Sequence, residues 1–302
     1  MTDPLRQEWL DIDGQTFAAI CAGNPEAPLL LCLHGFPEYS GAFEELIPLL
    51  ADRFHVVAPD QRGYGRSWKP QEIAAYAMPN LVRDAGAMIA RFGQGNPAAA
   101  VIGHDWGAAV AYALAFRNPG LVSRLVVVNG VHPAPFQRAL AAGGAQSVAS
   151  QYIDWLRADG SERALVENDH ARMFRIFSEH MDMSWMTPAR RARYRNAWGD
   201  MKGVRGMVNW YRASALKLAR PGAPLPKAAL PRLDPEALRV HMPHLVIWGE
   251  NDTALLPEAR DGLHEYCDDF RGVVTVPGAD HWVLHQKPQD VARHLLAFLE
   301  TS

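Results

Sequence analysis

Residues 103–107, with the sequence Gly-His-Asp-Trp-Gly, constrain the fold of this chain more than any other stretch. Their Gly-x-nucleophile-x-Gly form is typical of a tight turn that joins a strand to a helix and exposes the central side chain, here Asp105. Residues 98–102 are apolar and predict a short buried strand, and residues 108–116 predict an alanine-rich helix that ends at residues 118–120. A strand, a turn and a helix in this order predict an α/β fold with a mostly parallel sheet.

An aspartate at the centre of this motif, where serine is usual, changes the chemistry. A carboxylate is ionised near pH 7 and can displace a leaving group from saturated carbon, which forms an alkyl ester of Asp105. Water must then attack the carbonyl of this ester. We therefore expect a histidine base, an acid that orients the histidine, and an oxyanion hole. The alternative interpretation is an ordinary turn in which Asp105 caps the helix that follows.

The histidine and the acid are expected after the nucleophile, in the chain order nucleophile, acid, histidine. Residues 245–248 predict a buried strand, and Asp252 comes just after it, at the edge where open α/β sheets carry their sites. Residues 273–276 predict the last strand, and His281 lies between this strand and the final predicted helix, residues 288–299. This position in the loop after the last strand leads us to expect that His281 is the base.

Two other acidic residues compete with Asp252 for the role of the orienting acid. Asp280 is adjacent to His281 in the chain, but adjacent side chains point apart, which makes a contact between the two unfavourable. Glu250 is a weaker competitor. We therefore expect Asp252 to orient the histidine.

An oxyanion hole of this kind takes one N–H from the residue after the nucleophile and another from a loop after an early strand. The first donor is then Trp106. Residues 29–33 predict such an early strand, and His-Gly-Phe-Pro-Glu follows at residues 34–38. Because Pro37 has no N–H, we assign the second donor to Phe36. The bond before Pro37 is a candidate for the cis form.

Three runs of sequence resemble the signatures of the α/β-hydrolase-fold epoxide hydrolases: residues 34–38, residues 60–67 (Asp-Gln-Arg-Gly-Tyr-Gly-Arg-Ser) and residues 103–108. The resemblance covers nearly the whole chain. It implies an α/β-hydrolase fold, with a doubly wound sheet and an inserted helical lid. It also implies the roles of nucleophile, acid and base for the three residues already identified.

Members of that family hold the epoxide oxygen with two lid tyrosines. Residues 209–212, Asn-Trp-Tyr-Arg, are similar to the family's second lid-tyrosine motif, so the resemblance implies Tyr211. Tyr152 stands where the first lid tyrosine falls, although Trp155, one helical turn later, is an alternative. Opening an epoxide forms an alkoxide, and a phenol with a pKa near 10 can donate to it while staying protonated at rest. The alternative for both tyrosines is packing at the edge of the core.

The remaining pattern divides the chain into a core and an insertion. Strands are also predicted before the insertion, at residues 9–22 (a hairpin), 54–58 and 124–128. Between residues 132 and 243 the sequence is helical in character and rich in Arg, Met and Trp. We therefore expect an α/β-hydrolase core of residues 1–131 and 244–302, with residues 132–243 as a helical cap. Phe36, Trp106 and Trp155 are the candidate substrate contacts.

Composition limits the possible partners. The 302 residues are 48% hydrophobic, which is enough for a full core, and a net charge of −3 without a basic run offers little to nucleic acid. No apolar run is long enough to span a bilayer, and residues 1–4 do not begin a signal peptide, so we expect a cytoplasmic protein. The three cysteines suit neither a disulfide framework nor zinc. We expect no cofactor and no metal, a small uncharged epoxide and water as reactants, and a monomer or homodimer.

Other functions could use the same residues. A dehalogenase would form the same ester on Asp105 and bind halide, with the Trp106 indole as a donor. A dehalogenase acting on haloacids is disfavoured, because Trp106 and Ala109 stand where such enzymes resemble one another in carrying arginines for the substrate carboxylate. A non-catalytic binding protein of this fold would need a broken set of catalytic residues. A serine esterase is disfavoured because Ser40 and Ser67, the serines nearest the expected edge, lie on no such turn.

Overall fold

The computed structural model describes residues 5–300, so residues 1–4, on which the expectation of no signal peptide rests, lie outside it. Within the described range a sheet of eight strands forms the centre, in the order β1-β2-β4-β3-β5-β6-β7-β8. β1 pairs antiparallel with β2, and β2 with β4, whereas the other neighbouring strands are parallel. The strands are β1 (Arg6–Ile12), β2 (Gln15–Ala22), β3 (Leu29–Leu33), β4 (His55–Pro59), β5 (Ala100–His104), β6 (Leu125–Val128), β7 (His244–Gly249) and β8 (Phe270–Val276).

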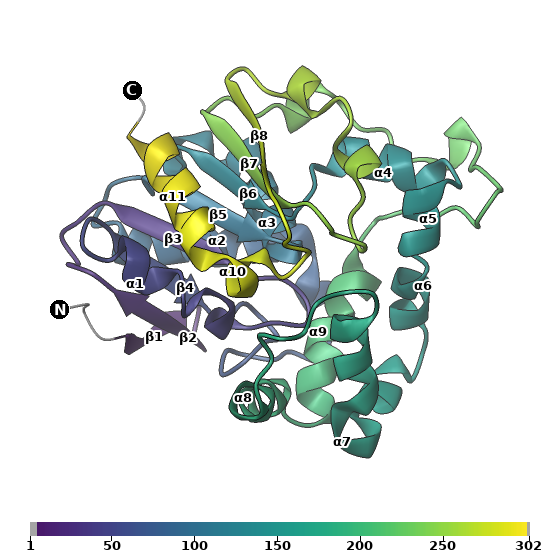
Figure 1. Ribbon diagram of the computed structural model, residues 1–302, viewed down its shortest axis with the longest axis horizontal. Helices are drawn as coiled ribbons and strands as arrows, with labels where there is room; N and C mark the ends of the chain where they lie inside the picture. The colour runs from purple at the N-terminus through teal and green to yellow at the C-terminus, as the bar shows by residue number, and fades with distance from the viewer. Residues whose placement is uncertain (1–4, 301–302) are drawn as a thin grey trace.

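Helices cover both faces of the sheet and gather beyond one end of it (Figure 1). α1 and α11 lie on one face, and α2 and α3 lie on the other (Figure 1). The helices are α1 (Ile47–Leu50), α2 (Met78–Phe92), α3 (Trp106–Arg117), α4 (Pro133–Ala141), α5 (Ala145–Ala149), α6 (Tyr152–Arg157), α7 (Ser161–Ser178), α8 (Pro188–Trp198), α9 (Met201–Ala213), α10 (Val283–Gln286) and α11 (Pro288–Leu299).

The two-sided packing explains why the central strands read as unbroken apolar runs. In β3, Leu29, Leu31 and Leu33 belong to the core that α2 and α3 complete, whereas Leu30 and Cys32 belong to the core on the side of α1 and α11. Successive side chains of a strand point to opposite faces, so a strand covered on both faces buries every residue. The strands β3, β4 and β5 are buried throughout.

The parallel strands place polar groups from distant parts of the sequence at one edge of the sheet. Phe36 follows β3, Asp105 follows β5, and Asn129 follows β6. Asp252 follows β7 and His281 follows β8. Because the carboxyl ends of parallel strands meet at the same edge, the fold brings these five positions together.

Glycines allow α3 to begin directly against the sheet. A Cβ on Gly107 would lie 1.9 Å from the carbonyl oxygen of Leu33, and a Cβ on Gly103 would lie 2.6 Å from the Cα of Ala108. Both separations are far shorter than any real carbon contact, so neither position can hold a larger residue without movement of the backbone. The close approach of helix and strand fixes the position of the turn between them.

A helical segment is inserted between β6 and β7. We call residues 132–243 the helical insert; it contains α4 to α9, and α5 to α9 gather beyond one end of the sheet (Figure 1). Its helix α7 is kinked, because Asn168, Asp169 and His170 have positive φ angles. Among residues 5–300, no helix is both long enough and apolar enough to cross a membrane.

The predicted α/β fold with a mostly parallel sheet is confirmed. The predicted bounds of the strand at residues 98–102 are wrong, since β5 spans Ala100–His104. The strand runs on to the turn because Gly103 pairs with Leu33 of β3 and His104 pairs with Val128 of β6. Ala98 forms only an isolated bridge with Val122.

Candidate active site

Asp105 lies on the sharp turn between β5 and α3. Its backbone has φ 50° and ψ −120°, a conformation that costs a non-glycine residue about 1–3 kcal/mol. Its side chain makes no capping hydrogen bond to the second or third residue of α3, so the alternative of a helix cap is wrong. Instead, the Phe36 N–H donates to Asp105 Oδ1 at 2.7 Å, and the Trp106 N–H also bonds this carboxylate. The peptide bond between Phe36 and Pro37 is cis.

His281 and Asp252 form a buried hydrogen-bonded pair. His281 Nδ1 lies 2.8 Å from Asp252 Oδ2, and the same oxygen accepts a hydrogen bond from Asn129 Nδ2 at 2.7 Å. The other carboxylate oxygen accepts the N–H groups of Ala254 and Leu255, each at 2.9 Å. Both oxygens of Asp252 therefore accept two hydrogen bonds each, which fixes the side chain and the ring that it holds.

The competing acids contact other groups. Asp280 accepts the N–H of Asp182 at 2.7 Å and the N–H of Trp282 at 2.9 Å, so it joins the helical insert to the histidine loop. Glu250 is exposed and lies near the N–H of Gly278. Neither side chain is the partner of the His281 ring, which pairs with Asp252.

The other ring nitrogen of His281 faces the nucleophile candidate. His281 Nε2 lies 3.8 Å from Asp105 Oδ2, and the two side chains are 4% and 13% exposed. The two oxygens of Asp105 thus have different surroundings: Oδ1 accepts a backbone N–H, whereas Oδ2 faces the imidazole. The arrangement can hold one oxygen still while the other reacts.

The charges of this group shift its pKa values. Burial lowers the pKa of His281, but the nearby carboxylates of Asp252 and Asp105 outweigh it and raise the pKa to about 9. Burial raises the pKa of Asp105, opposed by the charges of His281 and His104 and by the two backbone N–H groups. For Asp252 burial also acts upward, but His281 and its hydrogen bond bring the pKa below its ordinary value. At rest, His281 is therefore a cation between two carboxylates.

The two predicted tyrosines lie side by side across from Asp105. The ring centroids of Tyr152 and Tyr211 are 6.1 Å apart, edge to face. The Tyr211 ring also packs edge to face on Phe36 at 5.1 Å and on Trp106 at 5.2 Å. This places Tyr211 directly over the two residues whose N–H groups bond Asp105.

Both tyrosine hydroxyls stay protonated. Burial, the neighbouring Tyr152 and the charge of Asp105 raise the pKa of Tyr211 well above 10. Burial and Asp105 likewise raise the pKa of Tyr152, partly opposed by a hydrogen bond with Tyr211. Trp155, the alternative to Tyr152, instead has the Arg172 guanidinium 4.7 Å from its ring centroid. The contacts therefore favour Tyr152 over Trp155 as the partner of Tyr211.

Sequence reasoning missed several polar residues beside this site. Asn129 bonds Asp252 and also accepts the N–H of Gly249 at 2.7 Å. It follows β6 at the same edge as the predicted residues, so the rule that found Asp252 would also have found it. Glu38 and His104 were part of the quoted motifs but received no role; they are buried behind His281.

A hollow of about 450 Å³ lies elsewhere on the surface, between α7, α9 and the loop before α2. Asn209, Glu162 and Arg205 are among its lining residues, and none of Asp105, Asp252 or His281 lines it. Within residues 5–300, no three His, Cys, Asp or Glu side chains are grouped so as to hold a metal ion.

The chain matches the model of the alpha/beta hydrolase fold over residues 28–288. It therefore belongs to this family. It is 31% identical over 300 residues to the AB hydrolase superfamily protein YfhM of Bacillus subtilis, a match that covers 99% of both chains.

Solved structures narrow the resemblance to one kind of enzyme within the family. One, described among novel epoxide hydrolases from metagenomes of hot environments, is 34% identical, with a TM-score of 0.88 over the full length of both chains. Another is a mutant of a Bacillus megaterium epoxide hydrolase, complexed with its product, a naphthyloxy-propane-1,2-diol. It is 28% identical with a TM-score of 0.84, and the match covers 97% of this chain and all of that one. The chain is thus similar to epoxide hydrolases over its whole length.

The pairing of His281 with Asp105 can be tested in the free protein. Asp105→Asn removes one of the three negative charges that raise the pKa of His281, so this pKa should fall below 9 while the bond to Asp252 persists. Titration of isotope-labelled histidines followed by NMR measures both values. Glu250→Gln, which removes an exposed charge, is the control and should leave the His281 titration in place. An unchanged pKa in Asp105→Asn would show that the 3.8 Å contact carries no charge coupling.

Proposed function

We propose that this protein is an epoxide hydrolase that converts a small uncharged epoxide to a vicinal diol through an alkyl ester of Asp105. The observation that carries the proposal is that the two oxygens of the Asp105 carboxylate have different contacts. Oδ1 is held by the Phe36 N–H, with the Trp106 N–H beside it, whereas Oδ2 faces His281. Two protonated phenols, Tyr152 and Tyr211, stand nearby.

In the first step, the free oxygen of Asp105 attacks an epoxide carbon and the carbon–oxygen bond of the ring breaks. The electron pair of that bond goes to the epoxide oxygen, which Tyr152 and Tyr211 stabilise by donating hydrogen bonds and a proton. Their raised pKa values support this role, since the hydroxyls keep their protons until an alkoxide forms beside them. The carboxylate needs no base in this step.

In the second step, His281 removes a proton from water, and the water oxygen attacks the ester carbonyl of Asp105. Formation of the ester removes the negative charge that helped to hold the proton on His281. The pKa of His281 therefore falls when the ester forms, and its proton is released through water to the phenolate left by the first step. This restores the tyrosine and leaves a neutral imidazole that can act as a base. Asp252 stabilises the imidazolium that results.

The backbone N–H groups act in the second step. We infer that the carbonyl oxygen of the ester is Oδ1, which the Phe36 N–H already holds. The Trp106 N–H, which also bonds this carboxylate, is then the second donor to the negative charge of the tetrahedral intermediate. Donors placed in advance lower the barrier without reorganisation, and the loss of one costs about 2.7–4 kcal/mol in enzymes where it has been measured. Collapse of the intermediate breaks the bond between the carbonyl carbon and the diol oxygen. The diol oxygen takes the proton of the hydroxyl added from water, so the diol leaves and the carboxylate is restored.

We also infer that the helical insert is the lid over this site, so that residues 1–131 and 244–302 are the core and residues 132–243 are the cap. Tyr152 begins α6 and Tyr211 lies in α9, both in the insert, whereas Asp105, Asp252 and His281 follow strands of the core. The reaction therefore needs groups from both parts. The neighbour that is complexed with a naphthyloxy diol supports an apolar substituent on the epoxide.

A comparison of two substrates tests the class of reaction. We expect diol from styrene oxide and no bromide from a bromoalkane, because the phenols serve an alkoxide that needs a proton. The Trp106 indole, which a dehalogenase could use to bind halide, is hydrogen-bonded to Tyr211. Bromide release without diol would make the protein a dehalogenase, and neither product would favour a binding protein.

Single substitutions to Phe distinguish the chemical role of the Tyr152 and Tyr211 hydroxyls from the packing of their rings. Tyr211→Phe keeps the ring and removes one donor, so alkylation by an epoxide should slow on the order of ten- to a thousandfold, with little change in melting temperature. Tyr152→Phe should act in the same direction, and the double variant should nearly abolish alkylation. Rapid mixing of excess enzyme with styrene oxide measures this step.

The matched control is Tyr112→Phe, which removes a buried hydroxyl bonded to His244 at 2.9 Å, outside the site. It should leave the alkylation rate unchanged. If Tyr211→Phe alkylated as fast as the parent protein, the main chemical argument for an epoxide substrate would be lost. If only Tyr152→Phe kept the parent alkylation rate, the first hydrogen-bond donor to the epoxide oxygen would be another residue.

A further inference from the structure

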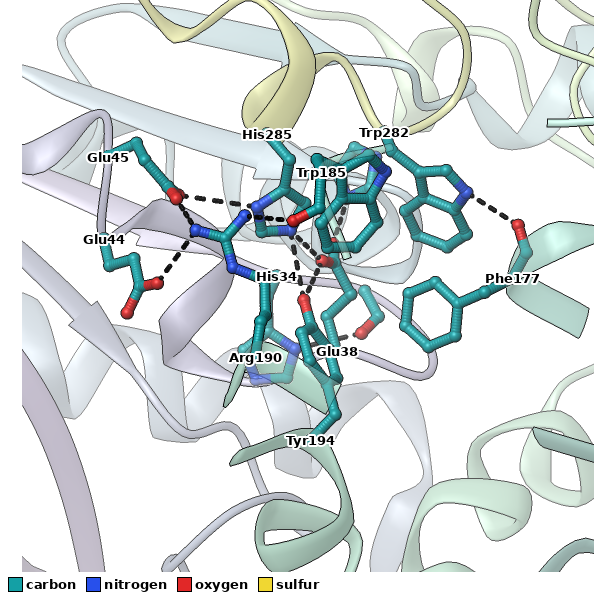
Figure 2. Close-up of polar contacts among 12 residues, drawn as sticks. His34, Glu38, Glu44, Glu45, Phe177, Trp185, Arg190, Tyr194, Trp282 and His285 are labelled. Carbon is teal, nitrogen blue, oxygen red and sulfur yellow. Dashed lines mark hydrogen bonds and ion pairs between the residues drawn. The ribbon is translucent and has the colours of Figure 1, made fainter. Parts of the chain in front are cut away.

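A buried polar cluster lies next to His281, through the contact of His104 with the His281 carbonyl. Figure 2 shows side chains of the core and of the helical insert meeting in it. We define the Glu38 cluster as Glu38, His104, Tyr194 and His285; none is more than 7% exposed. Glu38 and His104 come from the core, His285 follows the histidine loop in α10, and Tyr194 belongs to α8 of the insert. The proposed mechanism uses none of them directly.

Glu38 is the centre of this cluster. Its Oε1 accepts the hydroxyl of Tyr194 at 2.7 Å and lies 2.7 Å from His285 Nε2. Its Oε2 lies 3.1 Å from His104 Nδ1. A buried carboxylate without such partners would be costly, so the three contacts hold both the charge and the side chain in place.

The contacts of His104 determine where its protons lie. His104 Nε2 is 2.8 Å from the backbone carbonyl oxygen of His281, and a carbonyl only accepts, so Nε2 carries a proton. His104 Nδ1 faces the carboxylate of Glu38, whose Oε2 lies 3.1 Å away. Burial raises the pKa of Glu38, but hydrogen bonds from His104 and His285 outweigh it and hold the pKa well below its ordinary value. His104 thus donates from Nε2 to the His281 backbone and faces Glu38 with Nδ1.

This arrangement gives the His281 loop two anchors. One is the bond from the ring Nδ1 to Asp252. The other is the backbone carbonyl, which His104 holds while its ring lies 4.8 Å from the His281 ring. A shift of His104 would therefore move the catalytic imidazole relative to Asp105.

The helical insert reaches into the same cluster. Tyr194 supplies the hydroxyl to Glu38, and the Trp185 ring stacks on His285 with centroids 3.9 Å apart and planes 6° from parallel. Figure 2 shows these insert side chains meeting Glu38 and His285 of the core. The insert is thus fastened to the groups that hold the His281 loop.

An ion-pair network adds a second fastening beside the cluster. Arg190 lies in the first turn of α8. It pairs with Glu44 at 3.2 Å and with Glu45, both of the core (Figure 2). Glu45 Oε2 in turn lies 3.5 Å from His285 Nδ1. The position of α8 is therefore set by contacts to both sides of His285.

We propose that Tyr194 is a positioning residue for the catalytic histidine. Its hydroxyl bonds Glu38, Glu38 contacts His104, and His104 bonds the backbone of His281. The placement of His281 therefore depends on the position of α8, which carries Tyr194. The proposal rests on the proposed function, in which His281 acts on the ester and not on the epoxide. It follows that loss of the Tyr194 hydroxyl impairs the second step and spares the first. A purely structural role would slow both steps or neither.

The test compares the two half-reactions in Tyr194→Phe. Rapid mixing with styrene oxide and mass analysis of the quenched protein follow formation and decay of the Asp105 ester. We expect decay to slow about two- to tenfold, the equivalent of one hydrogen bond, while formation changes less than about twofold. Glu38→Gln, which removes the charge itself, should slow decay by roughly ten- to a hundredfold.

Tyr76→Phe is the matched control, because Tyr76 is also a buried tyrosine whose hydroxyl makes one 2.8 Å bond, to the carbonyl of Pro70 outside the cluster. It should match Tyr194→Phe in lost stability and leave both half-reactions unchanged. Equal slowing of both steps in Tyr194→Phe, or behaviour identical to this control, would overturn the proposal.

A second readout does not depend on activity. In isotope-labelled protein, the side-chain nitrogen signals of His104 and His281 should shift in Tyr194→Phe, whereas those of His244, bonded to Tyr112, should stay. Unmoved His281 signals would contradict the positioning role. If the parent protein forms no ester with epoxides, the proposed function fails, and the NMR comparison still decides whether Tyr194 is coupled to His281.

Discussion

The turn at Asp105 is the constraint on which the rest of the site depends. It joins a strand in the centre of the sheet to a helix that begins at the next residue, and it holds a non-glycine residue at φ 50°. The packing around it leaves no alternative, since even a Cβ at Gly35 would lie 2.1 Å from Asp105 Oδ1. The strain is tolerated because strand pairing on both sides of β5 fixes the chain as it enters the turn. The carboxylate is consequently aimed away from its own helix and toward the Phe36 N–H and His281.

Charge balance is the second organising element. Two buried carboxylates and one buried imidazole share the site, and the arrangement is favourable only while the imidazole carries a proton. In the proposed mechanism, formation of the ester on Asp105 removes one of these charges, which links the state of Asp105 to the basicity of His281. A second buried carboxylate, Glu38, lies behind this group and is contacted by the His104 and His285 rings. Buried carboxylates and imidazoles thus pack against each other in both layers of the site.

Much of the core could be predicted from the sequence, because local pattern and sheet geometry carry the information. Leu29–Leu33 and Pro288–Leu299 have the predicted bounds, since apolar runs and flanking turn residues define them. The preference for Asp252 over Asp280 followed from the directions of adjacent side chains, and the structure pairs Asp252 with His281. The strand before the turn was misplaced by two residues, because alanines fit a strand and a loop equally well.

The helical insert was less predictable. The relative placement of its helices depends on side-chain packing that helical periodicity does not encode, so Tyr152 and Trp155 remained alternatives until their neighbours were known. Tyr194 gave no signal at all, because it lies in a polar, arginine-rich helix and its role depends on a carboxylate 156 residues away.

The central claim is that Asp105 itself attacks the substrate carbon, and the origin of the new diol oxygen tests it most directly. In a single turnover with enzyme in excess and water labelled with heavy oxygen, the account predicts a diol without label, because its new oxygen comes from the carboxylate. The label should instead appear in the side chain of Asp105 after ester hydrolysis. A first-turnover diol that carries the full label would mean direct attack by water, and the covalent mechanism would be wrong.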